Sequence, residues 1–249
     1  MEELLDLRAT QNRPTEAFMN NDVSGTSLRD RIAEFTTAMA NAAPPEDIAT
    51  LSAELRKLAE SGIAKDALQI GGKAPDFTLP EARGGTVSLS SLLAKGPVVV
   101  TFYRGGWCPF CDLQLRAYQQ VLPETHRLGA ELVAICPQTP DYATADVEKK
   151  QLEFPVLTDA HNAVARRYGL VFVLSDALKA LQTAFGNPIP KFNGDDSWEL
   201  PMPGTFVLDR EGVVRLAHVD PDYTRRLEPA AILEALRKAR SRDMEPARG

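Results

Sequence analysis

One stretch of this 249-residue chain decides the fold: Phe102-Tyr103-Arg104-Gly105-Gly106-Trp107-Cys108-Pro109-Phe110-Cys111. It joins an apolar segment typical of a buried strand, Val98–Phe102, to a segment predicted to be helical from Pro109. Pro109 suits the first helical position, where its missing N–H is not needed. Cys108 then stands at the helix N-terminus, and Cys111 follows on the same helical face at about 5–6 Å between Cβ atoms. A small adjustment brings the thiols into disulfide range, so the pattern predicts a redox pair.

The position of Cys108 predicts which sulfur reacts. A helix N-terminus stabilises a thiolate, and a Cys-x-x-Cys thiol with a pKa near 7 is about half ionised at neutral pH, against about 3% for an ordinary thiol. Cys108 is therefore predicted to attack a peroxide or a disulfide, and Cys111 to resolve the product. A hydroperoxide would convert Cys108 to a sulfenic acid, which condenses with Cys111 to a disulfide.

Three other interpretations of the cysteine pair remain open: a zinc site, a static structural disulfide and two inert buried thiols. Zinc requires about four ligands, and the remaining Cys136, His126, His161 and His218 lack finger spacing. A structural disulfide is disfavoured in a reducing compartment. Inert thiols leave the strand-to-helix placement unexplained. We therefore predict no metal and no cofactor.

The residues before the pair have predicted roles in binding substrate or partner. Arg104 is interpreted either as a guanidinium beside the thiolate or a bound peroxide, or as a solvated loop charge. Trp107 is expected to pack beside the site and shield it. Gly105 and Gly106 are expected to form a tight turn in which a substrate or partner can approach the backbone.

Four residues farther along the chain carry further signals. Pro203 precedes the predicted strand Thr205–Leu208 and is a candidate cis-proline that lies against the cysteine pair, with a trans proline as the alternative. A cis-proline there would offer a backbone edge to an extended partner. Cys136 is predicted to be a small core residue, or else a second redox partner. Arg225 and Arg226 are interpreted as part of a solvated face.

Composition limits the classes of function. The net charge of −6 argues against a nucleic-acid or anionic-membrane partner. The first residues, Met1–Leu7, have no basic region ahead of an apolar run, so we expect no signal peptide, and apolar runs are too short to span a bilayer. Three cysteines in a chain of this size suggest a reducing compartment. The expected localisation is cytoplasmic.

The chain is predicted to have two parts, a helical extension over residues 1–70 and an α/β domain over residues 71–249. Apolar residues recur at helical spacing on both sides of Pro44-Pro45, which predicts two helices that act as a dimerisation arm or as a clamp on the main domain. Residues before Thr26 are expected to be loose. Asn187–Pro203 is predicted to be a long loop with a functional role.

The α/β domain is predicted to be a mixed central sheet flanked by helices. The predicted strands are Val98–Phe102, Glu131–Ile135, Phe154–Leu157, Thr205–Leu208 and Val213–His218. The predicted helices are Pro109–Leu128, with a kink at Pro123, Thr144–Leu152, Ala160–Tyr168, Ala177–Phe185 and Pro229–Lys238.

Two segments resemble a known superfamily. Gly71-Gly72-Lys73-Ala74-Pro75-Asp76-Phe77-Thr78-Leu79-Pro80 is similar to the opening of the alkyl hydroperoxide reductase/thiol-specific antioxidant, or peroxiredoxin, superfamily. Val99–Tyr118 resembles its peroxiredoxin-like branch with a Cys-Pro-x-Cys site, and the similarity runs from about Gly71 to Lys238. The resemblance implies a thioredoxin-like fold and reduction of hydrogen peroxide and organic hydroperoxides, with thioredoxin as the usual electron donor. It implies the peroxidatic role for Cys108 and the resolving role for Cys111.

The sequence also departs from the family pattern. Where typical members carry a Thr and an Arg that bind the peroxide, this chain has Gly105 and Pro203. The Trp-Cys-x-x-Cys arrangement looks more like a thioredoxin or a redoxin reductase. Three functions therefore remain open: a thioredoxin-dependent peroxidase, a thiol–disulfide oxidoreductase or endoperoxide-type reductase, and a non-enzymatic redox sensor that forms a homodimer.

Overall fold

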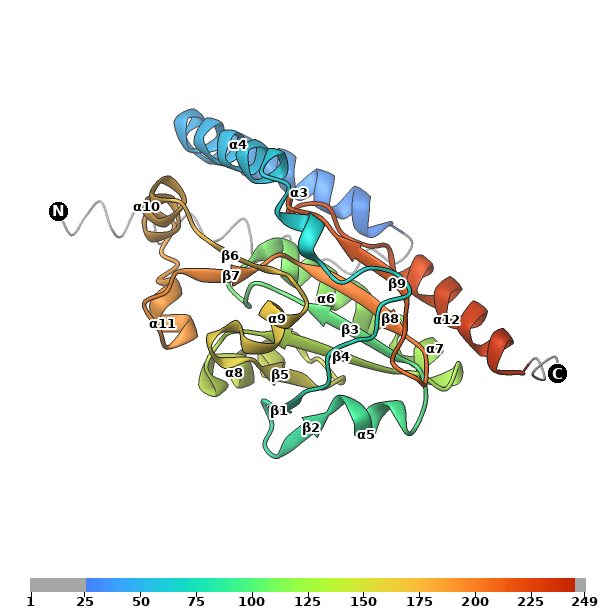
Figure 1. Ribbon diagram of the computed structural model, residues 1–249. Coiled ribbons are helices and arrows are strands. Elements are labelled where there is room, and N and C mark those ends of the chain that lie inside the picture. The colour runs from blue at the N-terminus through green and yellow to red at the C-terminus, as the bar shows by residue number, and fades with distance from the viewer. Residues whose placement is uncertain (1–25, 245–249) are drawn as a thin grey trace.

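The core of the protein is a five-stranded mixed sheet (Figure 1). The computed structural model describes residues 26–244. Parallel pairing joins β3, β4 and β5, whereas β8 and β9 extend the sheet by antiparallel pairing. Each strand lies within two residues of its predicted bounds, so the predicted α/β class with a mixed sheet is confirmed. Across the sheet the order is β5 (Val156–Thr158), β4 (Glu131–Cys136), β3 (Val98–Phe102), β8 (Gly204–Leu208) and β9 (Val214–Val219).

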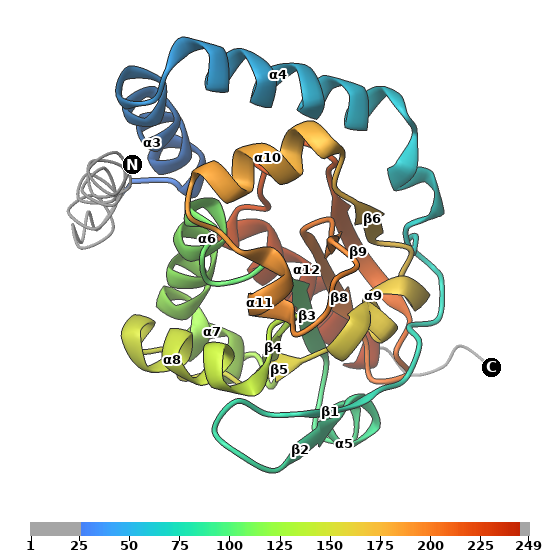
Figure 2. The ribbon, with the colours of Figure 1, turned by 90° about the vertical axis from the view of Figure 1, so that its left-hand side faces the viewer.

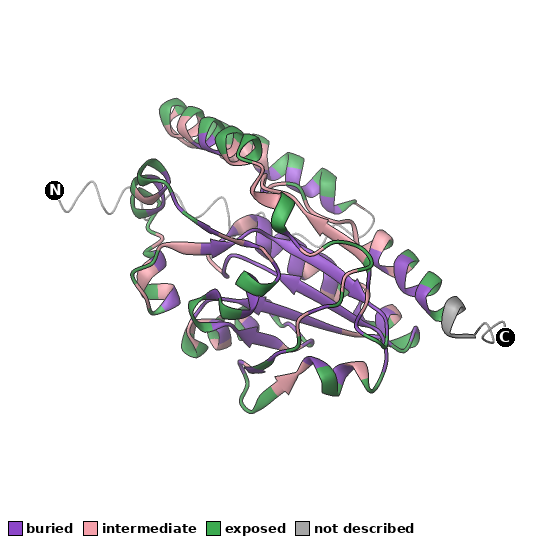
Figure 3. Cartoon of the chain, in the orientation of Figure 1, coloured by how far each residue is buried: buried purple, intermediate pink, exposed green. Residues whose placement is uncertain are grey.

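Strand β3 lies at the centre of the sheet because both of its faces are apolar. All five of its residues are buried (Figure 3). Val99 belongs to the core on one face of the sheet, and Val100 and Phe102 belong to the core on the other. A strand covered on both faces has a continuous apolar sequence rather than an alternating one, which is why Val98–Phe102 could be recognised.

Helices cover both faces of this sheet (Figures 1 and 2). The helices that share a core with Val99 are α3 (Leu28–Ala42), α4 (Pro45–Glu60), α6 (Pro109–Gln120), α7 (Leu122–Arg127), α8 (Pro140–Lys150), α10 (Asp176–Ala184), α11 (Ile189–Asn193) and α12 (Pro229–Met244). The helices that share a core with Phe102 are α5 (Leu89–Leu93) and α9 (Ala163–Arg167). Two short 3₁₀ helices, η2 (Ile63–Asp66) and η3 (Ala160–Asn162), complete the helical segments of the described chain.

The helix that carries the cysteine pair ends earlier than predicted. It was expected over Pro109–Leu128 with a kink at Pro123, and the structure has two helices that meet at Val121. Pro123 lies in the first turn of α7, where a missing N–H is tolerated. The kink is confirmed, and it separates α6 from α7.

The long loop predicted over Asn187–Pro203 is wrong. This segment contains α11 and the short strand β7 (Glu199–Pro201), which pairs with β6 (Val171–Val173) in a two-stranded antiparallel sheet. A second small sheet pairs β1 (Thr78–Pro80) with β2 (Thr86–Ser88). Strands of three residues are too short to carry a hydrophobic period, so neither small sheet was predicted.

The two predicted N-terminal helices, α3 and α4, are confirmed and pack on the main domain (Figure 2). Phe35 of α3 meets Phe110 of α6 edge to face, with ring centroids 5.4 Å apart. Helix α4 lies against α10, where Ser175 donates a hydrogen bond of 2.6 Å to Glu54. These contacts favour the clamp interpretation, whereas the dimerisation arm stays a prediction. The loose segment predicted before Thr26 lies outside the described residues.

None of the helices within residues 26–244 combines the length and the apolar character that crossing a bilayer requires.

Candidate active site

The cysteine pair lies where β3 gives way to α6. Cys108 is the N-cap residue of α6, and its carbonyl accepts hydrogen bonds from the N–H groups of Cys111 and Asp112 at 3.0 and 3.1 Å. The Cys108 N–H in turn donates to the carbonyl of Gly105 at 3.1 Å, which closes a turn before the helix. Both cysteines are free thiols and both are buried, with exposed fractions of 1% and 0%.

Arg104 is buried beside the pair. Its Nη1 approaches the Sγ of Cys108 at 3.8 Å, and its guanidinium lies over the rings of Trp107 and Tyr223 at 4.8 and 4.0 Å. Of the two interpretations made from the sequence, the structure has the guanidinium beside the sulfur. Trp107, which stacks on that guanidinium, is half-buried. The Nε of Arg104 and the indole Nε1 of Trp107 are both buried and find no hydrogen-bond acceptor among the described residues.

A second arginine reaches the pair, and the sequence interpretation of it was wrong. Arg226 was assigned to a solvated face, but its Nη2 donates to the Sγ of Cys111 at 3.5 Å. Its Nη1 donates to the side-chain oxygen of Gln114, and its Nε donates to the carbonyl of Tyr223 at 2.6 Å. Arg225 does lie on a solvated face. The sequence pattern around two adjacent arginines does not show which of them is buried, so the contact of Arg226 with Cys111 could not be predicted.

The pKa values of the two thiols are shifted in opposite directions. Burial raises the pKa of Cys108 well above its ordinary value, and the hydrogen bond to Cys111 adds to the rise. Burial acts in the same direction on Cys111, but the hydrogen bond from Cys108 and the charges of Arg226 and Arg104 outweigh it, so the pKa of Cys111 lies well below its ordinary value. The first negative charge of the pair is therefore held on Cys111, whereas the helix position alone had favoured Cys108.

The two glycines of the turn are required by their neighbours. Gly105 has a φ of 147°, and a Cβ there would overlap the indole of Trp107. A Cβ on Gly106 would overlap the carboxylate of Asp146, and the Gly106 N–H donates to Gln138 at 2.7 Å. The predicted tight turn is present, but the side chains of Trp107 and Asp146 occupy the space next to the two glycines.

A buried ion cluster of Lys150, Asp146 and Asp112 packs against this turn. The ammonium of Lys150, only 4% exposed, lies 3.0 Å from a carboxylate oxygen of Asp146 and 3.7 Å from one of Asp112. It also donates to the carbonyl of Gly106 at 3.4 Å. Arg116 pairs with the other oxygen of Asp112 at 3.1 Å. The cluster thus ties α8 to both the turn and the first turn of α6.

Pro203 lies at the expected edge of the sheet but in the other isomer. It is buried directly before Gly204, which pairs with Phe102 at the end of β3. Residues 26–244 contain no cis peptide bond, so the predicted cis-proline is wrong. The chain runs nearly directly from β7 into β8, with the Met202 N–H bonded to Leu170, and a trans peptide continues that extended path.

Cys136, His126 and His161 stand apart from the pair. Cys136 is 1% exposed at the end of β4, and burial raises its pKa to about 12, so it is a protonated core residue at neutral pH. His126 faces Glu131 and His161 faces Asp195. Among the described residues, no three Cys, His, Asp or Glu side chains gather as a metal site would require.

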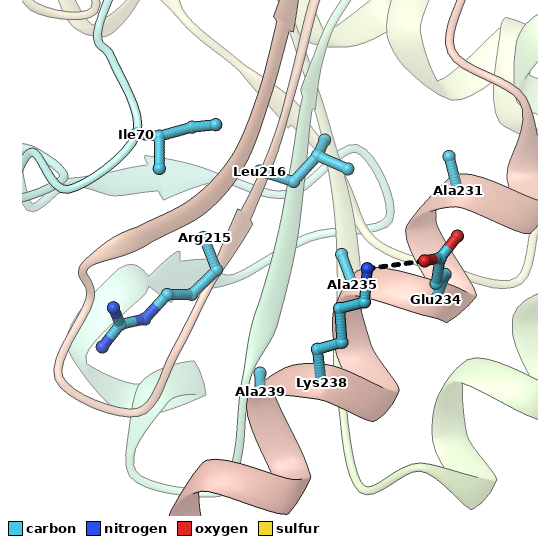
Figure 4. A pocket seen from close by; sticks show the side chains of 8 residues that line it. All are labelled: Ile70, Arg215, Leu216, Ala231, Glu234, Ala235, Lys238 and Ala239. Atoms are coloured by element: carbon cyan, nitrogen blue, oxygen red, sulfur yellow. Dashed lines mark ion pairs between the residues drawn. The ribbon is translucent and has the colours of Figure 1, made fainter.

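A surface pocket of about 260 Å³ lies between β9 and α12, beside Ile70 (Figure 4). Leu216 on its wall belongs to β9 and pairs with Val207, whereas the end of β9 nearer the cysteine motif is Val219, opposite Gly204. The pocket therefore opens toward the far end of the sheet and is separate from the thiols.

The fold and the site together define a thioredoxin-fold protein with a buried dithiol at a helix N-terminus. Residues 70–217 match the AhpC/TSA family. The chain belongs to this family. Helices α3 and α4, and the chain from His218 onward, lie outside the matched range.

Relatives and solved structures agree with this assignment. The chain is 32% identical over 173 residues to a chloroplastic peroxiredoxin Q of Triticum aestivum, covering 70% of this chain and 69% of the relative. It is 23% identical over 151 residues to the thiol-disulfide oxidoreductase ResA of Bacillus cereus, covering 60% and 69%. The peroxidoxin BcpB of Mycobacterium tuberculosis superposes with a TM-score of 0.54 at 23% identity, over 69% of this chain and 97% of that one. Peroxiredoxin Q of Xanthomonas campestris gives 0.52 at 21%, over 70% and 99%. At these identities the structural likeness establishes the fold.

Proposed function

We propose that this chain is a thiol-dependent peroxidase that reduces hydrogen peroxide and organic hydroperoxides with Cys108 and Cys111. The observation that carries the proposal is the dithiol at the start of α6 with a guanidinium at each sulfur: Arg104 lies 3.8 Å from the sulfur of Cys108, and Arg226 lies 3.5 Å from that of Cys111. The similarity to peroxiredoxin Q supports the same chemistry.

The reaction begins with a proton transfer between the two sulfurs. The hydrogen bond from Cys108 to Cys111 allows the Cys111 thiolate to take the Cys108 proton. The Cys108 thiolate then attacks the distal oxygen of the peroxide, the O–O bond breaks, and the leaving alkoxide or hydroxide takes up a proton. Cys111 attacks the Cys108 sulfenic acid and displaces its hydroxyl as water. One peroxide and two thiols thus give one disulfide, one alcohol or water, and one further water.

Two buried N–H donors, on Arg104 and Trp107, replace the Thr and the Arg that bind the peroxide in typical members of the family. The buried Nε of Arg104 and the indole N–H of Trp107 lack hydrogen-bond acceptors and belong to residues that stack on each other beside Cys108. Donors aimed at the oxygen on which charge develops stabilise the transition state. Arg104 and Trp107 therefore take the place of the Thr and the Arg that the chain lacks at Gly105 and Pro203.

A thioredoxin-type dithiol recycles the disulfide. Its first thiolate attacks Cys108, its second thiol releases the mixed disulfide, and the reductant leaves oxidised. This proposal places the protein in a reducing, cytoplasmic compartment. Both sulfurs are buried, so side chains beside the pair have to move before a partner thiol reaches them.

Stopped-flow fluorescence of the reduced protein tests the function. The indole of Trp107 lies next to the site, so mixing with hydrogen peroxide or an organic hydroperoxide is expected to change its emission in a single turnover. One peroxide should disappear per dithiol, and oxidised protein should recover on addition of reduced thioredoxin. A reaction no faster than that of free cysteine would rule out the peroxidase.

The second candidate is a thiol–disulfide oxidoreductase or a reductase of a special substrate such as an endoperoxide. The similarity to ResA and the glycine at position 105 favour it. In this case the reduced protein would reduce insulin disulfides while peroxide consumption stays negligible. A redox sensor would form its disulfide and change its oligomeric state, without turnover in either assay.

A further inference from the structure

A segment beyond the family match covers the dithiol. This cap segment, Asp220–Glu228, follows β9 and precedes α12, whereas the family match ends at residue 217. Its Tyr223 packs against Phe110, the residue between the two cysteines, with ring centroids 5.7 Å apart. Its Glu228 accepts hydrogen bonds from the N–H groups of Leu28 and Arg29 at 3.2 and 2.8 Å, which join the cap segment to the start of α3.

We infer that Arg226 of the cap segment is a catalytic residue that holds the Cys111 thiolate, both when Cys111 attacks the oxidised Cys108 and when it leaves from the disulfide. The contact is the hydrogen bond of 3.5 Å from Nη2 to Sγ. The inference deepens the proposed function and rests on it only for the identity of the oxidant.

The guanidinium is fixed in place by a buried network. Gln114, 2% exposed, donates from Nε2 to the hydroxyls of Thr101 and Thr205 at 3.1 and 3.2 Å. Because these bonds occupy its amide nitrogen, the oxygen of Gln114 is directed to Nη1 of Arg226. Tyr118 extends the network from Thr205 to the carbonyl of Leu227. Arg226 is therefore oriented by the central strands rather than by solvent.

Among the residues that the structure describes, no carboxylate forms an ion pair with Arg226. The ion pairs within residues 26–244 do not include Arg226, whereas its neighbour Arg225 pairs with Asp222 at 3.3 Å and with Asp220 at 3.7 Å. Its fixed partners are a neutral amide and a backbone carbonyl. An anion that develops on Cys111 therefore meets an oriented and unneutralised cation, which is the arrangement that stabilises charge most strongly in a buried site.

The interaction between Arg226 and the Cys111 thiolate is present only in the reduced state of the pair. The disulfide is neutral, whereas the reduced pair carries a thiolate, so Arg226 stabilises the reduced form over the oxidised form. When a reductant thiolate attacks Cys108, the S–S bond breaks and its electron pair goes to Cys111, beside Arg226. When Cys111 attacks the Cys108 sulfenic acid, the displaced hydroxyl takes up a proton and leaves as water.

The test compares Arg226→Gln and Arg226→Lys with Arg225→Gln as the matched control. The measurements are the ultraviolet absorbance of the thiolate against pH and the reduction potential against a glutathione buffer, neither of which requires peroxide. Besides Arg226, the titratable and charged groups that act on the pair are Arg104, Tyr223 and Tyr103, and these three are unchanged in all the variants.

Arg226→Gln is expected to raise the pKa of Cys111 by about one unit, which is a tenfold fall in the ratio of thiolate to thiol at a given pH. The same factor makes the pair more reducing by about 30 mV. Arg226→Lys should lie between Arg226→Gln and wild type, because it keeps the charge but loses the planar fork. Arg225→Gln should match wild type. If both Arg226 variants titrate and equilibrate like Arg225→Gln, the inference is wrong.

A further measurement keeps the test decisive if Arg226→Gln does not fold. In Cys108→Ser, the single remaining site cysteine lies beside Arg226, and its pKa is expected to be below that of an ordinary thiol. A pKa at or above the ordinary value would overturn the inference. A peroxidase failure would appear differently, as a normal thiolate titration without peroxide consumption.

Discussion

Replacing Cys108 by serine is expected to abolish peroxide consumption, whereas replacing Cys111 is expected to leave a single event in which Cys108 gains one oxygen. Cys108 is the N-cap residue of α6, and its sulfur lies 3.8 Å from a guanidinium nitrogen of Arg104. Without Cys111 the sulfenic acid has no resolving thiol, so it accumulates or oxidises further. Peroxide consumption and the mass of the intact protein measure both outcomes.

Cys136→Ser is the matched control for this pair of variants. Its thiol is also buried, but its pKa is raised to about 12 by burial, so it should contribute no nucleophile and its replacement should leave the rate unchanged. The opposite assignment of roles has a distinct signature. If Cys108→Ser gains the oxygen and Cys111→Ser does not react, then Cys111, whose pKa is lowered by its hydrogen bond from Cys108 and by the charges of Arg226 and Arg104, is also the sulfur that attacks.

Replacing Lys150 by methionine is expected to lower the free energy of unfolding by about 3–5 kcal/mol, because it removes the buried ammonium that pairs with Asp146 and that shares Asp112 with Arg116. The Lys150 side chain is 4% exposed and the side chains of Asp112 and Asp146 are 7% and 18% exposed, so water replaces little of the lost interaction. The turn at Gly106 loses its support at the same time, so peroxide reduction should slow as well. Chemical denaturation and single-turnover kinetics measure the two effects.

Two further variants separate the loss of the ion pair from the loss of the lysine stem. Lys149→Met, at an exposed position of the same helix, should cost less than about 1 kcal/mol. Adding Asp146→Asn to Lys150→Met removes one of the uncompensated charges and should recover part of the lost stability. A Lys150→Met protein as stable as Lys149→Met would show that the cluster does not hold the turn.

Local patterns were sufficient to predict the sheet and the redox helix. Val98–Phe102 is uniformly apolar because β3 is covered on both faces, and Pro109 marks a helix start from its own geometry. Apolar residues at helical spacing on both sides of Pro44-Pro45 predicted α3 and α4. The three-residue strands β6 and β7 escaped prediction because their pairing, rather than any period in the sequence, makes them strands. Pro203 was assigned the cis isomer because residue type and position do not fix the path of the chain between β7 and β8.

The sequence by itself determined that two cysteines share one helical face at the end of a buried strand, because that placement depends only on spacing, proline geometry and apolar pattern. Only the tertiary structure decided which charges surround them. Arg226 lies 115 residues from Cys111 along the chain. Helix α3, through Phe35, and the cap segment reach the region of the pair only because the chain folds back over α6. The ionisation of a buried thiol depends on distances to charges and on exclusion of water, and both are set by packing across the whole chain.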